Sequence, residues 1–155
     1  MKQIIVYESQ TGFTARYAEL LAQALGCEAV PRRQAPALDS YDRVIYGGWL
    51  MAGRIRGLDK MPHVRCLAVF AVGLMPEGEQ SLQRLRGENR LAEDTPLWYL
   101  RGGLRLGALP LHQRLLLRLL RAAAGGGVMA ECLGADSDHV DPDAIAAMAE
   151  TLRAE

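Results

Sequence analysis

The chain has 155 residues and a mass of 17.0 kDa, the usual size of one compact domain. Half of the residues are apolar and 23% are charged, which excludes a disordered chain, a collagen-like chain and a disulfide scaffold. The 18 Lys and Arg residues balance the 18 Asp and Glu residues, and the few aromatic residues are not interleaved with basic ones. We therefore expect a single domain over residues 1–155 and no nucleic-acid partner.

The first elements follow from short apolar runs and from one helical period. Residues 4–7 form a continuous apolar run, typical of a strand buried on both faces of a parallel sheet. From Gly12 to Leu25 the apolar residues recur with a period near 3.6, and Gly26 is placed to end that helix. A weak strand is predicted at residues 28–30 and a buried strand at 42–47, ended by Gly47 and Gly48.

The second half of the chain continues the alternation. A strand is predicted at residues 65–72, a polar helix at 79–91 and a strand from 97 to 100. Pro110 is placed to open a helix that the glycines at 125–127 close. At the end of the chain Asp141 is an N-cap candidate with Pro142 in the first helical position, before an apolar stripe that reaches Leu152.

Strands that alternate with helices predict an α/β fold, with a parallel sheet covered on both faces. Such sheets bind ligands outside the carboxyl ends of their strands, where the strand order reverses. The loops after Tyr7, Tyr46 and Val72 are therefore the candidate site.

The loop over residues 8–14 has the composition of an anion site. It places hydroxyls at Ser9, Thr11 and Thr14 around the start of a helix, and Gly12 allows a close approach of the backbone. An ordinary helix cap with turn residues is the alternative that this spacing leaves open. The loop contains neither GxxxxGK[ST] nor GxGxxG, so it favours neither a P-loop nor a Rossmann dinucleotide site.

Residues 5–14, IVYESQTGFT, resemble the phosphate-loop signature of flavodoxins, [ST]-x-T-G-x-T. Residues 42–53 and 69–75 resemble the third and fourth strands of that family with their flavin-flanking loops, so the resemblance covers nearly the whole chain. It implies a doubly wound five-stranded parallel sheet in the order 2-1-3-4-5, and FMN as the cofactor. The cofactor-binding residues that it implies are Ser9, Gln10, Thr11, Gly12, Phe13, Thr14, Gly48, Trp49, Leu50, Met51, Ala52, Gly73, Leu74 and Met75.

Two departures from the family bear on function. Trp49 comes earlier than the aromatic residue that flavodoxins often place against the flavin, so stacking and simple packing both remain open for it. The chain is neutral, whereas flavodoxins that serve as free carriers are strongly acidic, and this disfavours a free electron shuttle.

Residues 102–127 are predicted to be an insertion within the domain. Its helix carries Arg114, Arg118 and Arg121 at i, i+4 and i+7 among many leucines. Such a basic amphipathic helix can lie on an anionic membrane surface or cover an acidic substrate; a packing helix with a solvated arginine face is the alternative.

The insertion resembles that of the flavodoxin-like protoporphyrinogen oxidases, which use FMN and pass electrons to a membrane quinone. By this resemblance Arg101, Arg105, Arg114 or Arg118 pairs with substrate propionates, and these residues with Arg121 form a substrate or membrane face. In flavodoxins with such an insertion the fifth strand is split, so residues 128–133 are expected to be its second half.

The leading hypothesis is thus an FMN-dependent oxidoreductase or electron-transfer protein with a small-molecule, porphyrin or quinone redox partner. The flavin supplies the chemistry, so no catalytic side chain is required. No metal is predicted, because His63, His112 and His139 stand in no metal-binding spacing. The alternative is a flavodoxin-fold binding module without FMN that docks a partner through its Leu/Arg-rich helix.

The expected location is the cytoplasm, with peripheral contact of residues 110–124 on the inner face of the membrane as an open alternative. The three cysteines form no CxxC and leave an odd thiol, which fits a reducing compartment. The N-terminus shows no apolar segment of a signal peptide, and no apolar stretch approaches the roughly 20 residues that span a bilayer.

Overall fold

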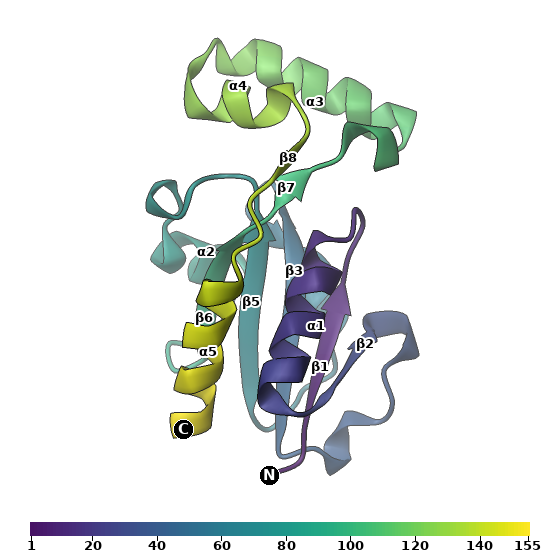
Figure 1. Ribbon diagram of the computed structural model, residues 1–155, viewed down its shortest axis with the longest axis vertical. Coiled ribbons are helices and arrows are strands. Elements are labelled where there is room, and N and C mark those ends of the chain that lie inside the picture. Colours follow the sequence, from purple (N-terminus) through teal and green to yellow (C-terminus); the bar gives the residue numbers. More distant parts are fainter.

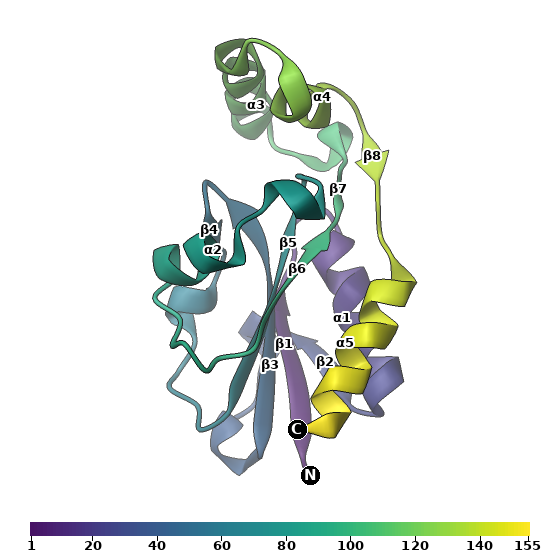
Figure 2. The ribbon, with the colours of Figure 1, turned by 90° about the vertical axis from the view of Figure 1, so that its left-hand side faces the viewer.

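A computed structural model describes all 155 residues as a parallel sheet with helices on both faces (Figures 1 and 2). The strands of the sheet stand in the order β2-β1-β3-β5-β6, and each neighbouring pair is parallel. This is the predicted 2-1-3-4-5 order, so the expected flavodoxin-like α/β architecture is confirmed. The five strands are β1 (Gln3–Glu8), β2 (Glu28–Pro31), β3 (Arg43–Met51), β5 (Leu67–Gly73) and β6 (Leu97–Arg101).

Two helices cover one face of the sheet and one helix covers the other. Figure 2 shows α1 (Phe13–Leu25) and α5 (Pro142–Ala154) side by side on one face, and α2 (Leu82–Glu88) on the opposite face. As predicted, Gly26 ends α1 in the left-handed conformation. Asp141 caps α5, because its side chain accepts a hydrogen bond from the amide of Asp143 at 2.9 Å.

The core is divided by the sheet into two layers, because successive strand residues point to opposite faces. Ile5, Ile45 and Phe70 pack with α1 and α5, whereas Ile4, Val44 and Val69 pack with α2. All six of these side chains are essentially inaccessible to solvent.

Two predicted boundaries were wrong. β3 does not end at Gly47 and Gly48 but continues to Met51 and pairs with β4 (Arg54–Ile55) in an antiparallel hairpin. The turn is made by Ala52 and Gly53, both with positive φ. The helix predicted at 79–91 is limited to α2, because a 3-10 turn at Glu77–Glu79 precedes it and Ser81 caps its start.

The chain leaves the sheet after β6 and forms a helical pair above its carboxyl edge. A two-stranded ribbon of β7 (Gly103–Leu104) and β8 (Ser137–Asp138) carries α3 (Leu111–Ala124) and α4 (Gly127–Gly134), as Figure 1 shows. No helix is long and apolar enough to traverse a lipid bilayer.

The second half-strand expected at 128–133 was wrong, since these residues lie in α4. Residues 128–133 are VMAECL, which has no polar–apolar alternation and contains the good helix formers Met, Ala, Glu and Leu. After Gly125, Gly126 and Gly127, all with positive φ, the chain turns back along α3. The returning chain then pairs with β7 rather than with the sheet, so β6 remains an edge strand of the sheet.

The remaining loops contain four further 3-10 turns, at Arg32–Gln34, Leu38–Ser40, Leu58–Lys60 and Leu106–Ala108.

Candidate functional site

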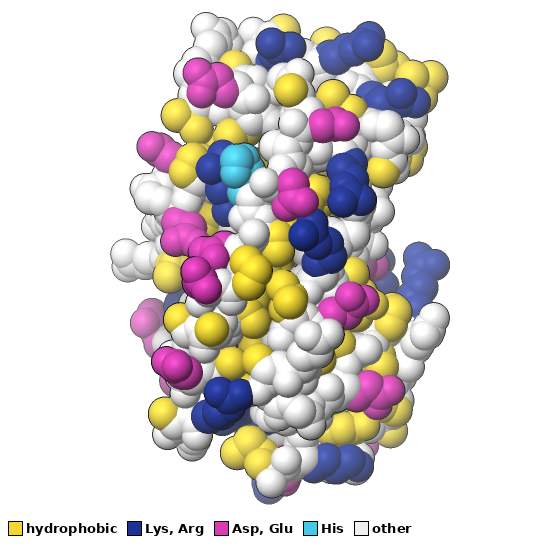
Figure 3. Space-filling model, viewed as in Figure 1, with side chains coloured by type: hydrophobic (Ala, Val, Ile, Leu, Met, Phe, Trp, Pro, Cys, Tyr) yellow, Lys and Arg dark blue, Asp and Glu magenta, His cyan; other side chains and the backbone are white.

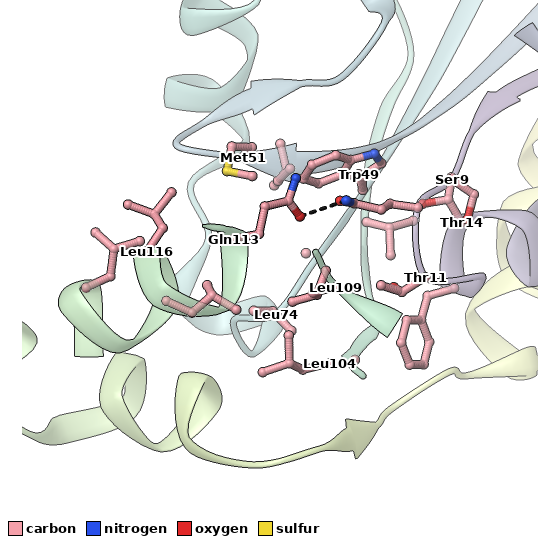
Figure 4. A pocket seen from close by; sticks show the side chains of 18 residues that line it. Ser9, Thr11, Thr14, Trp49, Met51, Leu74, Leu104, Leu109, Gln113 and Leu116 are labelled. Atoms are coloured by element: carbon pink, nitrogen blue, oxygen red, sulfur yellow. Dashed lines mark hydrogen bonds between the residues drawn. The ribbon is translucent and has the colours of Figure 1, made fainter. Parts of the chain in front are cut away.

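A pocket opens where the sheet, α1 and α3 meet, at the carboxyl ends of the strands (Figure 4). Its enclosed volume is about 130 Å³, below the roughly 300–1,000 Å³ that is typical of small-molecule sites. Its lining residues are Ser9, Gln10, Thr11, Phe13, Thr14, Trp49, Leu50, Met51, Val72, Gly73, Leu74, Gly103, Leu104, Leu109, Gln113, Leu116, Leu117 and Leu120. The three loops predicted from the sequence therefore meet at one site.

One wall of the pocket is the uncapped start of α1. Gly12, in the left-handed conformation, precedes the helix, and no side chain caps it. The amides of Phe13, Thr14 and Ala15 find no acceptor among the hydrogen bonds of the chain, and the first turn contains no acidic residue. The free amides and the positive end of the helix dipole together suit an anion. The alternative of an ordinary side-chain cap for this loop is not observed.

Hydroxyl groups surround these free amides. The Ser9 hydroxyl accepts a hydrogen bond from the Gly12 amide at 3.2 Å, which shapes the turn. Thr14 is only 2% exposed, so its hydroxyl lies out of reach of bulk water, whereas Thr11 is partly exposed. The loop thus offers hydroxyl and amide donors together, a combination that fits a phosphate monoester without a lysine.

The apolar walls come from the ends of β3 and β5. Trp49, Leu50 and Met51 line one side of the pocket, and Gly73 with Leu74 lines another. The Arg56 guanidinium lies over the Trp49 ring, 5.4 Å from its centre, so a cation covers part of the indole. Whether Trp49 stacks on a flavin stays a prediction.

Four of the predicted cofactor-binding residues do not line the pocket: Gly12, Gly48, Ala52 and Met75. Three of them shape the loops that do. Gly12 starts α1, and Ala52 makes the hairpin turn. A side chain at Gly48 would overlap Ile55 and the Arg56 carbonyl, so glycine is required by this close approach.

Tyr99, which the sequence did not single out, holds the loop after β5. Its hydroxyl donates to the Met75 carbonyl at 2.6 Å, and Arg101 Nε donates to the Leu74 carbonyl at 3.3 Å. Burial raises the pKa of the Tyr99 phenol, so this group stays protonated and remains a donor. The only sequence signal for this role was the position of Tyr99 on β6, the strand next to β5.

Helix α3 forms the roof of the pocket, so part of the insertion predicted at residues 102–127 lines the same pocket as the predicted flavin-flanking loops. Gln113, Leu116, Leu117 and Leu120 occupy one face of α3, at i, i+3, i+4 and i+7. The Gln10 side-chain amide donates to Gln113 Oε1 at 2.7 Å, which joins the roof to the phosphate loop (Figure 4). Leu104 and Leu109 complete this apolar side.

The five arginines predicted to form one face lie in different surroundings. Arg101 reaches under the loop after β5, and Arg105 lies over the Phe13 ring at 5.2 Å from its centre. The guanidinium of Arg121 lies next to Gly134 at the end of α4, where a cation complements the helix dipole. Arg114 and Arg118 are exposed on α3. The structure therefore separates Arg101 and Arg105 from the arginines of α3.

The pocket contains no titratable side chain among its lining residues. It offers an anion site at one end and apolar surfaces elsewhere, so its own side chains supply no acid, base or nucleophile. Nor does the chain hold a group of three or more His, Cys, Asp or Glu residues placed to bind a metal ion. Any redox chemistry here must come from a bound cofactor.

Several solved structures resemble this chain at low sequence identity. A protein of Bacteroides uniformis designated a flavoprotein shares 15% identity with a TM-score of 0.51, covering 69% of this chain and 94% of its own. A flavoprotein of Lactobacillus acidophilus in complex with FMN shares 15% identity, with a TM-score of 0.47 and coverage of 64% and 92%. A flavodoxin from the domain Archaea shares 15% identity, with a TM-score of 0.47 and coverage of 99% of both chains.

Comparison with protein families covers most of the chain. A search among curated proteins finds no match. The family model of the flavodoxin domain matches residues 4–128, which include the phosphate loop, both flavin-flanking loops and α3. This match supports FMN as the cofactor. The chain therefore belongs to the flavodoxin domain family.

Proposed function

We propose that the chain is an FMN-dependent electron-transfer protein whose pocket under α3 holds the cofactor. One observation carries the proposal: an uncapped helix start, rich in hydroxyls, opens directly into an apolar pocket without titratable groups. An anionic tail and an apolar ring in one ligand match these two ends. FMN combines them.

Different residues bind the phosphate and the ring of FMN. Thr11, Thr14 and the free amides of the first turn of α1 hold the phosphate. Trp49 and Leu74, from the loops after β3 and β5, contact the ring, and Leu117 of α3 shields it from water. When bound, FMN supplies one- and two-electron redox chemistry, and the protein sets its orientation and surroundings.

The test is a titration of the apoprotein with FMN and with riboflavin, which has the same ring but no phosphate. We expect a yellow complex with FMN and an affinity for riboflavin at least about tenfold lower, because the charged hydrogen bonds are lost. A protein that binds neither flavin would refute the proposal and favour the binding module that docks through its Leu/Arg-rich helix.

We further propose that the substrate is a reduced porphyrin such as protoporphyrinogen IX, with a quinone as electron acceptor. The apolar roof of α3 supports an extended apolar substrate, and the exposed Arg105, over the Phe13 ring that lines the pocket, supports carboxylate substituents. Anaerobic mixing of the FMN-loaded protein with protoporphyrinogen should bleach the flavin absorbance. Bleaching by NAD(P)H alone would instead identify a reductase.

Peripheral contact with a membrane is part of this proposal. Leu111, Leu115 and Leu119 lie on the side of α3 away from the pocket and are 66%, 48% and 69% exposed. Figure 3 shows basic and hydrophobic side chains together at the end of the molecule where α3 and α4 lie. Exposed leucines beside arginines suit an anionic bilayer surface.

A further inference from the structure

A second hollow lies beside the cofactor pocket and shares no lining residue with it. It is bounded by the end of β1, the β3–β4 hairpin, the turn at Leu58–Lys60 and the residues that follow α2. Its cavity volume is about 570 Å³. Its lining residues are Glu8, Arg54, Ile55, Arg56, Gly57, Leu58, Asp59, Lys60, Asn89 and Arg90.

Four cationic side chains line this hollow without an ionic partner. Arg54, Arg56, Lys60 and Arg90 make no salt bridge and donate no side-chain hydrogen bond. Of the two carboxylates, Glu8 is paired with Arg32 at 3.1 Å, which leaves only Asp59 to offset the four cations. Like charges gathered in one concavity repel one another, so a bound anion would stabilise this part of the fold.

The backbone that presents these cations is held in place by partly buried polar contacts. The Asn89 side chain accepts from the Ile55 amide at 2.7 Å and donates to the Gly53 carbonyl at 2.9 Å, which ties α2 to the hairpin. The Tyr46 hydroxyl donates to the Arg56 carbonyl at 2.6 Å. A site whose frame is already fixed loses less entropy when it binds a ligand.

Arg90 follows Asn89 with a φ of 54°, the left-handed conformation that commonly ends a helix. Its amide donates to the Gly87 carbonyl at 3.2 Å and that of Leu91 to the Arg86 carbonyl at 3.0 Å, so this turn fixes the backbone that carries Arg90. Here the left-handed residue is one of the four cations that line the hollow.

We propose that this hollow binds the pyrophosphate group of a nucleotide. Guanidinium groups pair with phosphate oxygens in a bidentate manner, and three arginines with one lysine match the several oxygens of two linked phosphates. The hollow is concave and polar, which suits a small polyanion better than a flat membrane surface. Because Arg56 also lies over Trp49 of the cofactor pocket, a nucleotide here lies next to that pocket. The proposal does not depend on FMN binding.

The experiment is isothermal titration of the flavin-free protein with pyrophosphate, ADP and NADP⁺ at low ionic strength, where charge pairing is least screened. All three should bind, and Arg54→Gln with Arg90→Gln should weaken each by at least about tenfold. The matched control, Lys2→Gln with Arg65→Gln, removes two exposed charges at the opposite end of the sheet and should leave binding unchanged. Stronger binding of NADP⁺ than of ADP identifies a dinucleotide, and equal binding identifies a nucleoside diphosphate.

The proposal is overturned if none of the three ligands binds, or if both double variants lose affinity equally. Unfolding midpoints check the fold of each variant. The repelling cations predict that the Arg54/Arg90 variant is at least as stable as the wild type. An FMN titration of the same variants separates the two sites, since FMN affinity should stay unchanged in both.

Discussion

Replacement of Thr11 and Thr14 by valine tests the phosphate site most directly. Valine keeps the β-branched shape of threonine and removes only the hydroxyl, so the packing around Thr14, which is 2% exposed, is preserved. A hydrogen bond to a charged group contributes about 1.5–3 kcal/mol, and about 1.4 kcal/mol corresponds to a tenfold change in affinity. Water can replace the partly exposed Thr11 hydroxyl but not the buried Thr14 hydroxyl, so Thr14 should carry most of the effect.

We expect the double variant to bind FMN at least about tenfold more weakly than the wild type, and riboflavin with unchanged affinity. Quenching of flavin fluorescence measures both constants. The control is Thr95→Val with Thr151→Val, two threonines outside the pocket. An unchanged FMN constant, or an equal loss for FMN and riboflavin, would refute the assignment of these hydroxyls to the phosphate.

Three further predictions concern the ring site, the core and α3. Trp49→Ala should brighten bound FMN and weaken its binding by about 0.5–1.5 kcal/mol if the indole stacks on the ring, and unchanged emission and affinity would make Trp49 a packing residue. Gly47→Ala should lower the free energy of unfolding by about 1–3 kcal/mol in urea, because the added methyl overlaps the Phe70 ring, whereas Gly78→Ala, which meets no atom, should have little effect. Joint replacement of Arg114, Arg118 and Arg121 by Gln should weaken the binding free energy to anionic liposomes by about 1 kcal/mol per charge, measured by co-sedimentation, while the FMN content is retained. Wild-type protein that does not bind such liposomes contradicts the membrane contact.

The parallel sheet could be predicted because its strands are short, apolar and buried on both faces. Val44, Tyr46 and Val69, for example, lie in runs that only a covered strand explains. From these strands, the rule that ligands bind at the carboxyl ends predicts the position of the pocket. The extension of β3 to Met51 could not be predicted, because two glycines ended the pattern and the partner strand β4 has only two residues. Glycine was required there by close packing rather than by a turn.

The conformation of residues 102–138 depends on tertiary contacts that the sequence pattern alone does not contain. The composition of VMAECL favours a helix, and the strand was expected only from the resemblance to a split fifth strand; the turn at 125–127 then places the segment against α3. The role of α3 in the pocket did have a signal, since Gln113, Leu116, Leu117 and Leu120 share one helical face. The stripe of Arg114, Arg118 and Arg121 lies on a different face of the same helix, and the function was predicted from that face.

Helix α3 is apolar on two sides, and this explains how one element can serve both the cofactor pocket and a surface. Leu117, Leu116 and Leu120 line the pocket, the last two still 43% and 47% exposed, while Leu111, Leu115 and Leu119 lie on the other side of the helix. The helix is carried on a short ribbon and joined to the phosphate loop by a hydrogen bond between Gln10 and Gln113. If the outer leucines were buried in a bilayer surface, the change would therefore reach the roof of the pocket through α3 itself and not through the core of the sheet.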